Sequence, residues 1–309
     1  MTPRPARILL CSLALVSATA LGQVLQEFHP ERQQPVRLVM PELSAEVVAG
    51  PVDPMTAGGR IIEISALGSK FSVPLPLQFH QVSAIIQGPP GKLVVVGMYN
   101  QYGYEVGIID VAAGRLVDRF GCYIPAVSPD GQYVAFTKLF PSHGRITPED
   151  HAMLYVVAGS LLENRPPGLR KDIIDIDDED VGFGVYPVGI GNREGDNVNV
   201  PPETAHTVAG YYFWKDPNQY FFADRTAKEF RIICVAIAKG KATVRGFLVP
   251  PAQFGGRRDD FPSRLEDVSF EGDSIKLTIR TNVTRSLVLK LADFANLGSV
   301  DLARPPAIK

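Results

Sequence analysis

Val127-Ser-Pro-Asp-Gly-Gln-Tyr-Val-Ala-Phe136 is the stretch that decides the fold of this 309-residue chain. The segment Ile124 to Val127 before the turn Ser128 to Gly131, and the segment Gln132 to Phe136 after it, each read as a short strand, so Ile124 to Phe136 predicts two antiparallel strands. Proline presets the backbone angle at the second position of a turn, and the Asp-Gly pair accepts the positive φ that follows. The stretch therefore predicts a β-hairpin whose turn is specified by its own residues.

Similar hairpins recur along the chain. Turn residues Gly91 and Gly131 are 40 residues apart, and Gly131 and Asn218 are 87 apart, which is about two such intervals. Units of this length with four strands each are typical of a β-propeller. The longer interval predicts one degenerate unit around residues 159 to 205. The other hairpins are Ile85-Ile-Gln-Gly-Pro-Pro-Gly-Lys-Leu-Val-Val-Val96, Phe213-Trp-Lys-Asp-Pro-Asn-Gln-Tyr-Phe-Phe-Ala223 and Val268-Ser-Phe-Glu-Gly-Asp-Ser-Ile-Lys-Leu277.

These motifs resemble those of a known group, the WD-repeat-like propellers of exported bacterial proteins, of the kind found in the translocation protein TolB. Residues 127 to 136 match the repeat motif well, and two or three other stretches match it in part. The resemblance implies an all-β propeller of four-stranded antiparallel blades, about six in number within a range of five to seven. It implies no activity, because the motif residues build a turn and include no catalytic group.

Composition supports this fold class. The chain has 28 Gly and 26 Pro residues, a density of turn formers that favours many short strands over long helices. Its 45% hydrophobic content and formal net charge of −2 exclude disordered, collagenous and nucleic-acid-coating proteins. We therefore expect no nucleic-acid partner.

The N-terminus has the three parts of a secretory signal peptide. Arg4 and Arg7 form a positive region, Ile8 to Val16 is an apolar run too short to span a bilayer, and Ala18-Thr-Ala20 supplies small residues for cleavage. Cleavage after Ala20 or after Gly22 fits equally well. The sequence therefore predicts a secreted or periplasmic protein.

Removal of the signal peptide sets the expected domain organisation. Residues 1–22 are the signal peptide, 23–45 a leader, 46–297 the propeller and 298–309 a C-terminal tail. No later apolar run is long enough for a transmembrane span, so we expect an exported soluble chain. We also expect it to be a monomer.

Two cysteines remain after cleavage, Cys122 and Cys234. An oxidising compartment permits a disulfide between them. The alternative is a pair of free thiols, because Phe230 to Ile237 is apolar enough to be a buried strand, in which a thiol behaves as a small hydrophobe. If the two lie in blades separated by another blade, their Cα atoms are farther apart than the roughly 7 Å that a disulfide tolerates.

The acidic run Asp172-Ile-Ile-Asp-Ile-Asp-Asp-Glu-Asp180 is the sharpest chemical feature. Oxygen ligands at alternating positions suit Ca²⁺, which takes six to eight of them. The spacing and central glycine of an EF-hand are absent, and a solvated loop between blades explains the run as well and is the favoured reading. The candidate calcium ligands are Asp175, Asp177, Asp178 and Asp180.

Known catalytic motifs are missing. The five histidines show no zinc-ligand spacing, and there is no Gly-x-Ser-x-Gly elbow, phosphate-binding loop or GxGxxG. Seven aromatic residues gather in Tyr211-Tyr-Phe-Trp214 and Tyr220-Phe-Phe222. They suit either a platform that stacks on a ligand or a core between blades, and the core is the favoured alternative.

Two classes of function follow. The first is a non-catalytic binding or scaffold module that presents a rigid face to a protein or polymer partner in the cell envelope. The second is a propeller enzyme, a hydrolase or lyase, with a site at the channel mouth that could be metal-dependent. Because the chain has no local catalytic motif, we favour the binding module and assign no catalytic residue.

Overall fold

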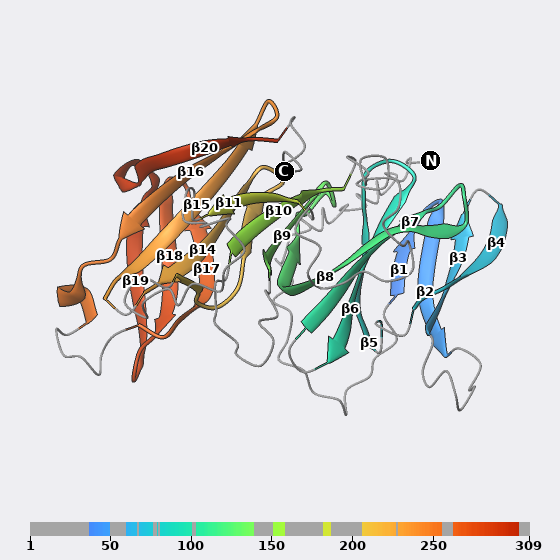
Figure 1. Ribbon diagram of the computed structural model, residues 1–309, viewed down its shortest axis with the longest axis horizontal. Coiled ribbons are helices and arrows are strands. Elements are labelled where there is room, and N and C mark those ends of the chain that lie inside the picture. Colours follow the sequence, from blue (N-terminus) through green and yellow to red (C-terminus); the bar gives the residue numbers. More distant parts are fainter. Residues whose placement is uncertain are drawn as a thin grey trace, which may run out of the picture.

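A computed structural model describes residues 37–49, 60–66, 68–76, 79, 81–100, 103–138, 151–157, 182–186, 206–226, 228–254 and 262–302. Within these residues the regular structure is antiparallel β-strand, apart from two short 3₁₀ segments, η1 (Pro251–Phe254) and η3 (Leu291–Asp293). The prediction of an all-β fold is confirmed (Figure 1).

The first unit is a four-stranded meander in which each strand pairs with the next along the chain. The strands are β1 (Arg37–Met40), β2 (Leu43–Ala49), β3 (Arg60–Ala66) and β4 (Ser69–Pro74). Its first strand lies inside the stretch that the sequence assigned to the leader. The reason is that Arg37 to Met40, which include three apolar residues, pair with Leu43 to Glu46.

The next two units share one long strand. The seven-stranded sheet runs in order from β5 to β11 and changes register within β8, where Ile124 takes a positive φ of 44°. The first part of β8 therefore closes the second unit, and its last part opens the third. The strands are β5 (Gln81–Gln87), β6 (Lys92–Asn100), β7 (Gly103–Asp110), β8 (Arg115–Val127), β9 (Tyr133–Lys138), β10 (His151–Val156) and β11 (Phe183–Tyr186).

The fourth unit begins with an interrupted strand, because β12 and β13 pair in turn with successive parts of β14. The fifth unit has three strands, and the strand that follows them, β20, returns to pair with β16 of the fourth. The strands are β12 (Thr207–Val208), β13 (Phe213–Asp216), β14 (Gln219–Arg225), β15 (Phe230–Ala238), β16 (Lys241–Leu248), β17 (Arg264–Glu271), β18 (Ser274–Arg280), β19 (Thr284–Lys290) and β20 (Ala295–Asp301).

The predicted repeat is confirmed by the position of its turns. Ser128 to Gly131 joins β8 to β9, and the turn at Asp216 to Asn218 joins β13 to β14, so each connects the first strand of a unit to the second. Gly91 and Gly272 lie in the same connection of the second and fifth units. The similar turn sequences therefore mark equivalent places in successive sheets.

Neighbouring units pack face to face through apolar side chains. Ile62 and Ile64 of β3 pack with Leu93 and Val95 of β6, and all four side chains are fully buried. Comparable cores lie between the second and third, third and fourth, and fourth and fifth units. Alternation along each strand places successive side chains on opposite faces, so a unit between two neighbours is apolar on both.

The outward faces of the two end units are polar. Lys70 and Glu63 form a 2.6 Å ion pair across β3 and β4, and Arg280 pairs with Glu266 at 2.6 Å across β17 and β18. Figure 1 shows β1–β4 and β17–β19 at opposite ends of the long axis. The described units therefore follow one another as an arc whose two ends face solvent.

The first strands of all five described units line a shared cavity, which is the arrangement of a β-propeller around its central channel. The fold is a propeller, as predicted. Five units lie within the described residues, so the expected total of about six blades stays a prediction. The degenerate unit expected between the turns at Gly131 and Asn218 does not separate the third and fourth described units, because these pack directly on each other. Of residues 159 to 205, the strand β11 belongs to the third unit, and most of the others lie outside the described residues.

Both remaining cysteines are free and buried, Cys122 on β8 and Cys234 on β15. The third unit lies between these strands, which confirms the expectation that they do not form a disulfide. Burial raises the pKa of both thiols, that of Cys234 to about 11, so both side chains are protonated and act as small hydrophobes.

Candidate functional site: a cavity at the centre of the units

The cavity has a volume of about 680 Å³ and is lined mainly by first strands. A first strand pairs on one side only, so its other edge and alternate side chains face the centre. β1 shows this clearly: Leu38 and Met40 line the cavity, whereas Val39 between them points outward and is 62% exposed. The other first strands contribute Ala84 to Gln87, Ile124 to Val127, Phe213 to Lys215, and Asp267, Val268 and Phe270.

The only tryptophan of the chain, Trp214, holds two first strands together at this cavity. Its indole Nε1–H donates a 3.0 Å hydrogen bond to the carbonyl oxygen of Ala126 on β8. Its ring packs against Tyr220 with centroids 4.7 Å apart, and 7% of the residue is exposed. Trp214 therefore links the third and fourth units at the cavity wall through both a hydrogen bond and ring packing.

The aromatic cluster is buried between units, as the favoured alternative predicts, and part of it also lines the cavity. Tyr220, Phe221 and Phe222 are fully buried. Tyr212, Phe213 and Trp214 are buried in the same cores, and together with Tyr211 they also line the cavity. Alternation along a strand could not reveal this, because it does not tell which strand is innermost.

Few polar groups face the cavity. The Lys215 ammonium lies 5.8 Å from the centroid of the Phe270 ring, and Asp267, an exposed residue of β17, is also part of the lining. The Tyr212 hydroxyl is already bonded, to Thr137 Oγ1 at 2.8 Å and to the Phe136 carbonyl at 3.1 Å. Among the described residues, the cavity lining is therefore mainly apolar and aromatic, with Lys215 and Asp267 as its charged residues and Gln87 and Ser128 as further polar ones.

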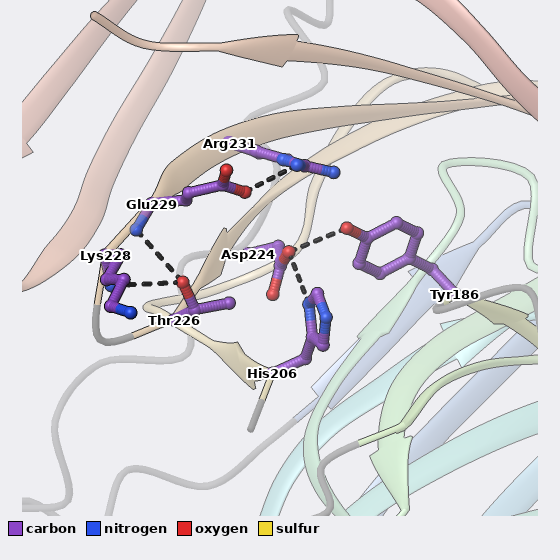
Figure 2. A network of polar contacts seen from close by, with 7 residues as sticks. All are labelled: Tyr186, His206, Asp224, Thr226, Lys228, Glu229 and Arg231. Atoms are coloured by element: carbon purple, nitrogen blue, oxygen red, sulfur yellow. Dashed lines mark hydrogen bonds and ion pairs between the residues drawn. The ribbon is translucent and has the colours of Figure 1, made fainter. Parts of the chain in front are cut away.

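A second polar cluster lies where β11 meets the fourth unit (Figure 2). The buried Asp224 carboxylate accepts a 2.7 Å hydrogen bond from the Tyr186 hydroxyl, and the same oxygen lies 2.8 Å from His206 Nδ1. Burial and the neighbouring Asp224 carboxylate raise the pKa of Tyr186. The cluster joins β11, β12 and β14 at the end of the core between the third and fourth units.

This cluster contains part of a catalytic arrangement. A buried carboxylate that orients a histidine through Nδ1 is the pair that activates nucleophiles in many hydrolases. The His206 side chain is 17% exposed. Arg231 lies beside the cluster with Nη2 2.5 Å from Glu229, while its buried Nε has no hydrogen-bond partner within the described residues. Sequence reasoning missed the cluster because His206 has no nearby partner in sequence.

A buried ion pair lies in the second unit. Glu105 Oε1 is 3.6 Å from Arg119 Nη1 across β7 and β8, and Glu105 is 5% exposed. Burial raises the pKa of Glu105 to about 7, and the opposing effect of the Arg119 charge is smaller. Asp118, also on β8, accepts a 2.6 Å hydrogen bond from the hydroxyl of Tyr155, which lies on β10 of the third unit.

The candidate calcium ligands Asp175, Asp177, Asp178 and Asp180 lie outside the described residues. Across the part of the chain that the structure describes, no three His, Cys, Asp or Glu side chains are placed to share a metal ion. That part also holds no helix with the length and hydropathy needed to cross a membrane.

Comparison with known proteins does not assign a family. No family model matches the chain, and no curated protein matches its sequence. Solved structures that resemble it include a prolyl endopeptidase, with a TM-score of 0.40 and 14% identity over 89% of this chain. This chain spans 35% of the length of that endopeptidase.

Propeller structures are also among the matches. The β-propeller domain of the Trilobed protease from Pyrococcus furiosus matches with a TM-score of 0.33 and 9% identity, over 88% of this chain and 85% of that domain. An acylaminoacyl peptidase from Pyrococcus horikoshii matches with a TM-score of 0.32 and 8% identity, over 85% of this chain and 45% of its own. Likeness at this level assigns neither an activity nor a partner.

Proposed function

We propose that this protein is an exported, non-catalytic β-propeller that binds a segment of a protein or polymer partner in its central cavity. One observation carries the proposal: the first strands of all five described units line one cavity with apolar and aromatic side chains. A cavity built from many separate strands is held rigidly, so a partner is bound without much reorganisation of the protein.

The lining favours an extended segment with apolar or aromatic side chains. Trp214, Phe270 and Tyr211 offer flat rings, and aromatic anchors in desolvated pockets supply most of the binding energy at protein interfaces. Lys215 and Asp267, of opposite charge, would orient the segment through its polar groups. The proposed partner is therefore an extended polypeptide or polymer that carries apolar side groups and few charges.

We also propose that the protein is exported and that it is related to the TolB-type propellers. Residues 1 to 22 support export, and residues 127 to 136 support a relationship to the TolB-type propellers of exported bacterial proteins. The near-neutral charge supports a protein or polymer partner rather than a nucleic acid. We propose that the exported chain is a monomer.

Selection of peptides on the native protein tests the binding proposal. A random-peptide library is panned on the immobilised protein, and affinities of the selected peptides are measured for two variants, Lys215→Glu and Asp267→Lys. We expect selected peptides to be apolar or aromatic and to bind each variant at least about tenfold more weakly. Matched charge reversals outside the cavity lining, Lys241→Glu and Asp293→Lys, should leave affinity unchanged. Equal loss in all four variants would contradict the proposal.

The Asp224 and His206 pair supports a second candidate function, acid–base catalysis at the junction of the third and fourth units. In this case His206 would accept a proton from water or from a substrate hydroxyl, with its orientation set by Asp224. A panel of chromogenic esters, glycosides and peptides tests this candidate. Turnover that His206→Asn abolishes, while the melting temperature is retained, would replace the binding proposal.

A further inference from the structure

The outer edge of the fifth unit differs from the other outer edges of the propeller. The sheet of β17, β18 and β19 ends at β19, and no other described strand pairs with that edge. The chain segment that follows β19 does not add a fourth strand there, because β20 crosses to the fourth unit and pairs with β16. Among the described strands, the backbone of β19 is therefore hydrogen-bonded on one side only.

Other outer strands carry features that discourage added strands. β4 ends in Pro74, which has no backbone N–H to donate. β11 has only four residues and a register shift against β10, and β20 has a register shift against β16. Proline, short length and bulges are the usual protections of an edge strand. β19 lacks these three features, because all seven of its residues pair with β18 without a shift. Its only protection of the kinds known for edge strands is the charge of Arg285 and Lys290.

The two faces of β19 have different chemistry. Leu287 and Leu289 point into the core shared with the fourth unit. On the opposite face Val288 is 63% exposed and lies beside the exposed Lys290. Val288 is also paired with Lys276 of β18, which is exposed on the same face. Toward the core the edge therefore presents Leu287 and Leu289, with the half-buried Arg285 at the start of the strand, and toward solvent it is basic.

Charge at this edge has one sign. The strands β18 and β19 together contain Lys276, Arg280, Arg285 and Lys290 and no acidic residue. Arg280 is neutralised by Glu266, whereas no ion pair is found for Lys276 or Lys290 among the described residues. An incoming strand with carboxylates on its solvent face would meet complementary charge.

We propose that β19 is a docking edge that takes up an extended strand of a partner protein as the fourth strand of this sheet. The partner strand alternates apolar residues, which extend the layer of Leu287 and Leu289, with acidic residues, which lie beside Lys290 and Lys276. Backbone hydrogen bonds hold the strand and the alternating side chains select it, which is the established mode of strand addition. This surface is separate from the central cavity.

Three labelled peptides test the proposal by fluorescence anisotropy on the full chain. One alternates glutamate and valine, the second alternates lysine and valine, and the third is the glutamate–valine peptide interrupted by prolines, which cannot pair along its length. The first peptide should bind at least about tenfold more tightly than either of the others, and its affinity should fall with added salt. Equal binding of the first and third peptides would overturn the proposal.

Matched variants locate the site. Val288→Glu places a negative charge beside the glutamates of the bound peptide. It should weaken the affinity for the glutamate–valine peptide at least about tenfold. Val39 is equally exposed, on β1 in the unit at the opposite end of the arc, so Val39→Glu is the control and should leave affinity unchanged. Equal loss in both variants would overturn the proposal. Val288→Thr keeps a β-branched side chain and should retain binding.

Hydrogen exchange identifies what covers the edge. Amides in residues 284 to 290 should exchange rapidly in the free protein at alternate positions and become protected when the glutamate–valine peptide binds. Protection already present in the free protein would show that the chain covers its own edge, and a dimer that Val288→Glu dissociates would show that a second copy does. Either result would overturn the proposal. Emission from Trp214 should not change in these titrations, so this test is independent of the cavity.

Discussion

The second and third units carry almost the same hairpin turn, yet the two turns differ in structure. Gly88-Pro-Pro-Gly91 links β5 to β6, and Ser128-Pro-Asp-Gly131 links β8 to β9. In the second unit the Lys92 N–H donates to the Pro89 carbonyl, so Gly91, with φ 77°, takes the third position, as in a type II turn. In the third unit the Gly131 N–H donates to the Ser128 carbonyl, so the glycine takes the fourth position.

The two glycines also differ in how closely other atoms surround them. A side chain at Gly91 would meet no atom within 4 Å, whereas a Cβ at Gly131 would lie 2.0 Å from the Gln87 carbonyl oxygen and 2.6 Å from the Gly88 Cα. The turn of the third unit is therefore seated against the turn region of the second. The comparison shows that both turns specify a hairpin. Of the two, only the turn with Gly131 also determines how neighbouring units pack.

The largest expected effect is at Gly131. Gly131→Ala would force a Cβ into the backbone of the preceding unit and would also place a non-glycine residue at φ 68°. We expect it to lower the free energy of unfolding by at least about 3 kcal/mol, or to prevent folding. Urea unfolding followed by circular dichroism measures this. A loss no greater than that of Gly91→Ala would mean that the two turns are alike after all.

The second unit should show the next largest effect, through pH. Burial raises the pKa of Glu105 to about 7, so between the unfolded value near 4.5 and 7 the folded protein keeps a proton that the unfolded chain releases. Stability from this group therefore falls as the pH rises through this range, by about 3 kcal/mol in total. Urea unfolding at pH 5 and pH 8 should show this loss. If the change is the same in Glu105→Gln, this carboxyl is not its source.

Ser128 should show a smaller effect, specific to the third unit. Its hydroxyl is fully buried, donates to Asp130 Oδ1 at 2.7 Å and accepts from the Tyr133 N–H at 3.0 Å. Ser128→Ala removes both bonds and should cost about 2 kcal/mol in the free energy of unfolding. The matching residue of the second unit, Gly88, has no side chain, so that turn forms without such bonds. If Ser128→Ala does not measurably lower the free energy of unfolding, the turn of the third unit, like that of the second, does not depend on side-chain hydrogen bonds.

The smallest effect should be that of Gly91→Ala. The new methyl group meets no neighbour, so only the cost of placing alanine at φ 77° remains, about 1 kcal/mol. Thermal unfolding of this variant and of Gly131→Ala at the same pH gives the comparison directly. A loss from Gly91→Ala above about 3 kcal/mol would show that this turn also supports packing between units.

Sequence reasoning was most successful where structure is local. The turns at Gly91, Gly131 and Asn218 could be predicted because Pro, Gly and Asn determine their own backbone angles, and the recurrence of the turns then implied repeated units. The burial of Tyr220 to Phe222 followed from their apolar character. These features depend on residues that are neighbours in the chain.

The candidate site depends on contacts between distant strands, which the sequence does not encode in any local pattern. His206 and Asp224 are 18 residues apart, and Tyr186 is 38 residues from Asp224. Nothing in the alternation of β12 and β13 indicates that they are the innermost strands of a unit. The raised pKa of Glu105 likewise comes from burial between units, whereas a single glutamate in an alternating strand usually indicates a solvent face.

The most direct test of the central claim uses the only tryptophan of the chain. Trp214 lines the central cavity, so a peptide selected on the native protein and labelled with a fluorescence quencher should quench its emission as the peptide binds. The account predicts saturable quenching, with the same dissociation constant that anisotropy gives for the peptide. Binding by anisotropy with unchanged Trp214 emission would place the partner elsewhere and contradict the account.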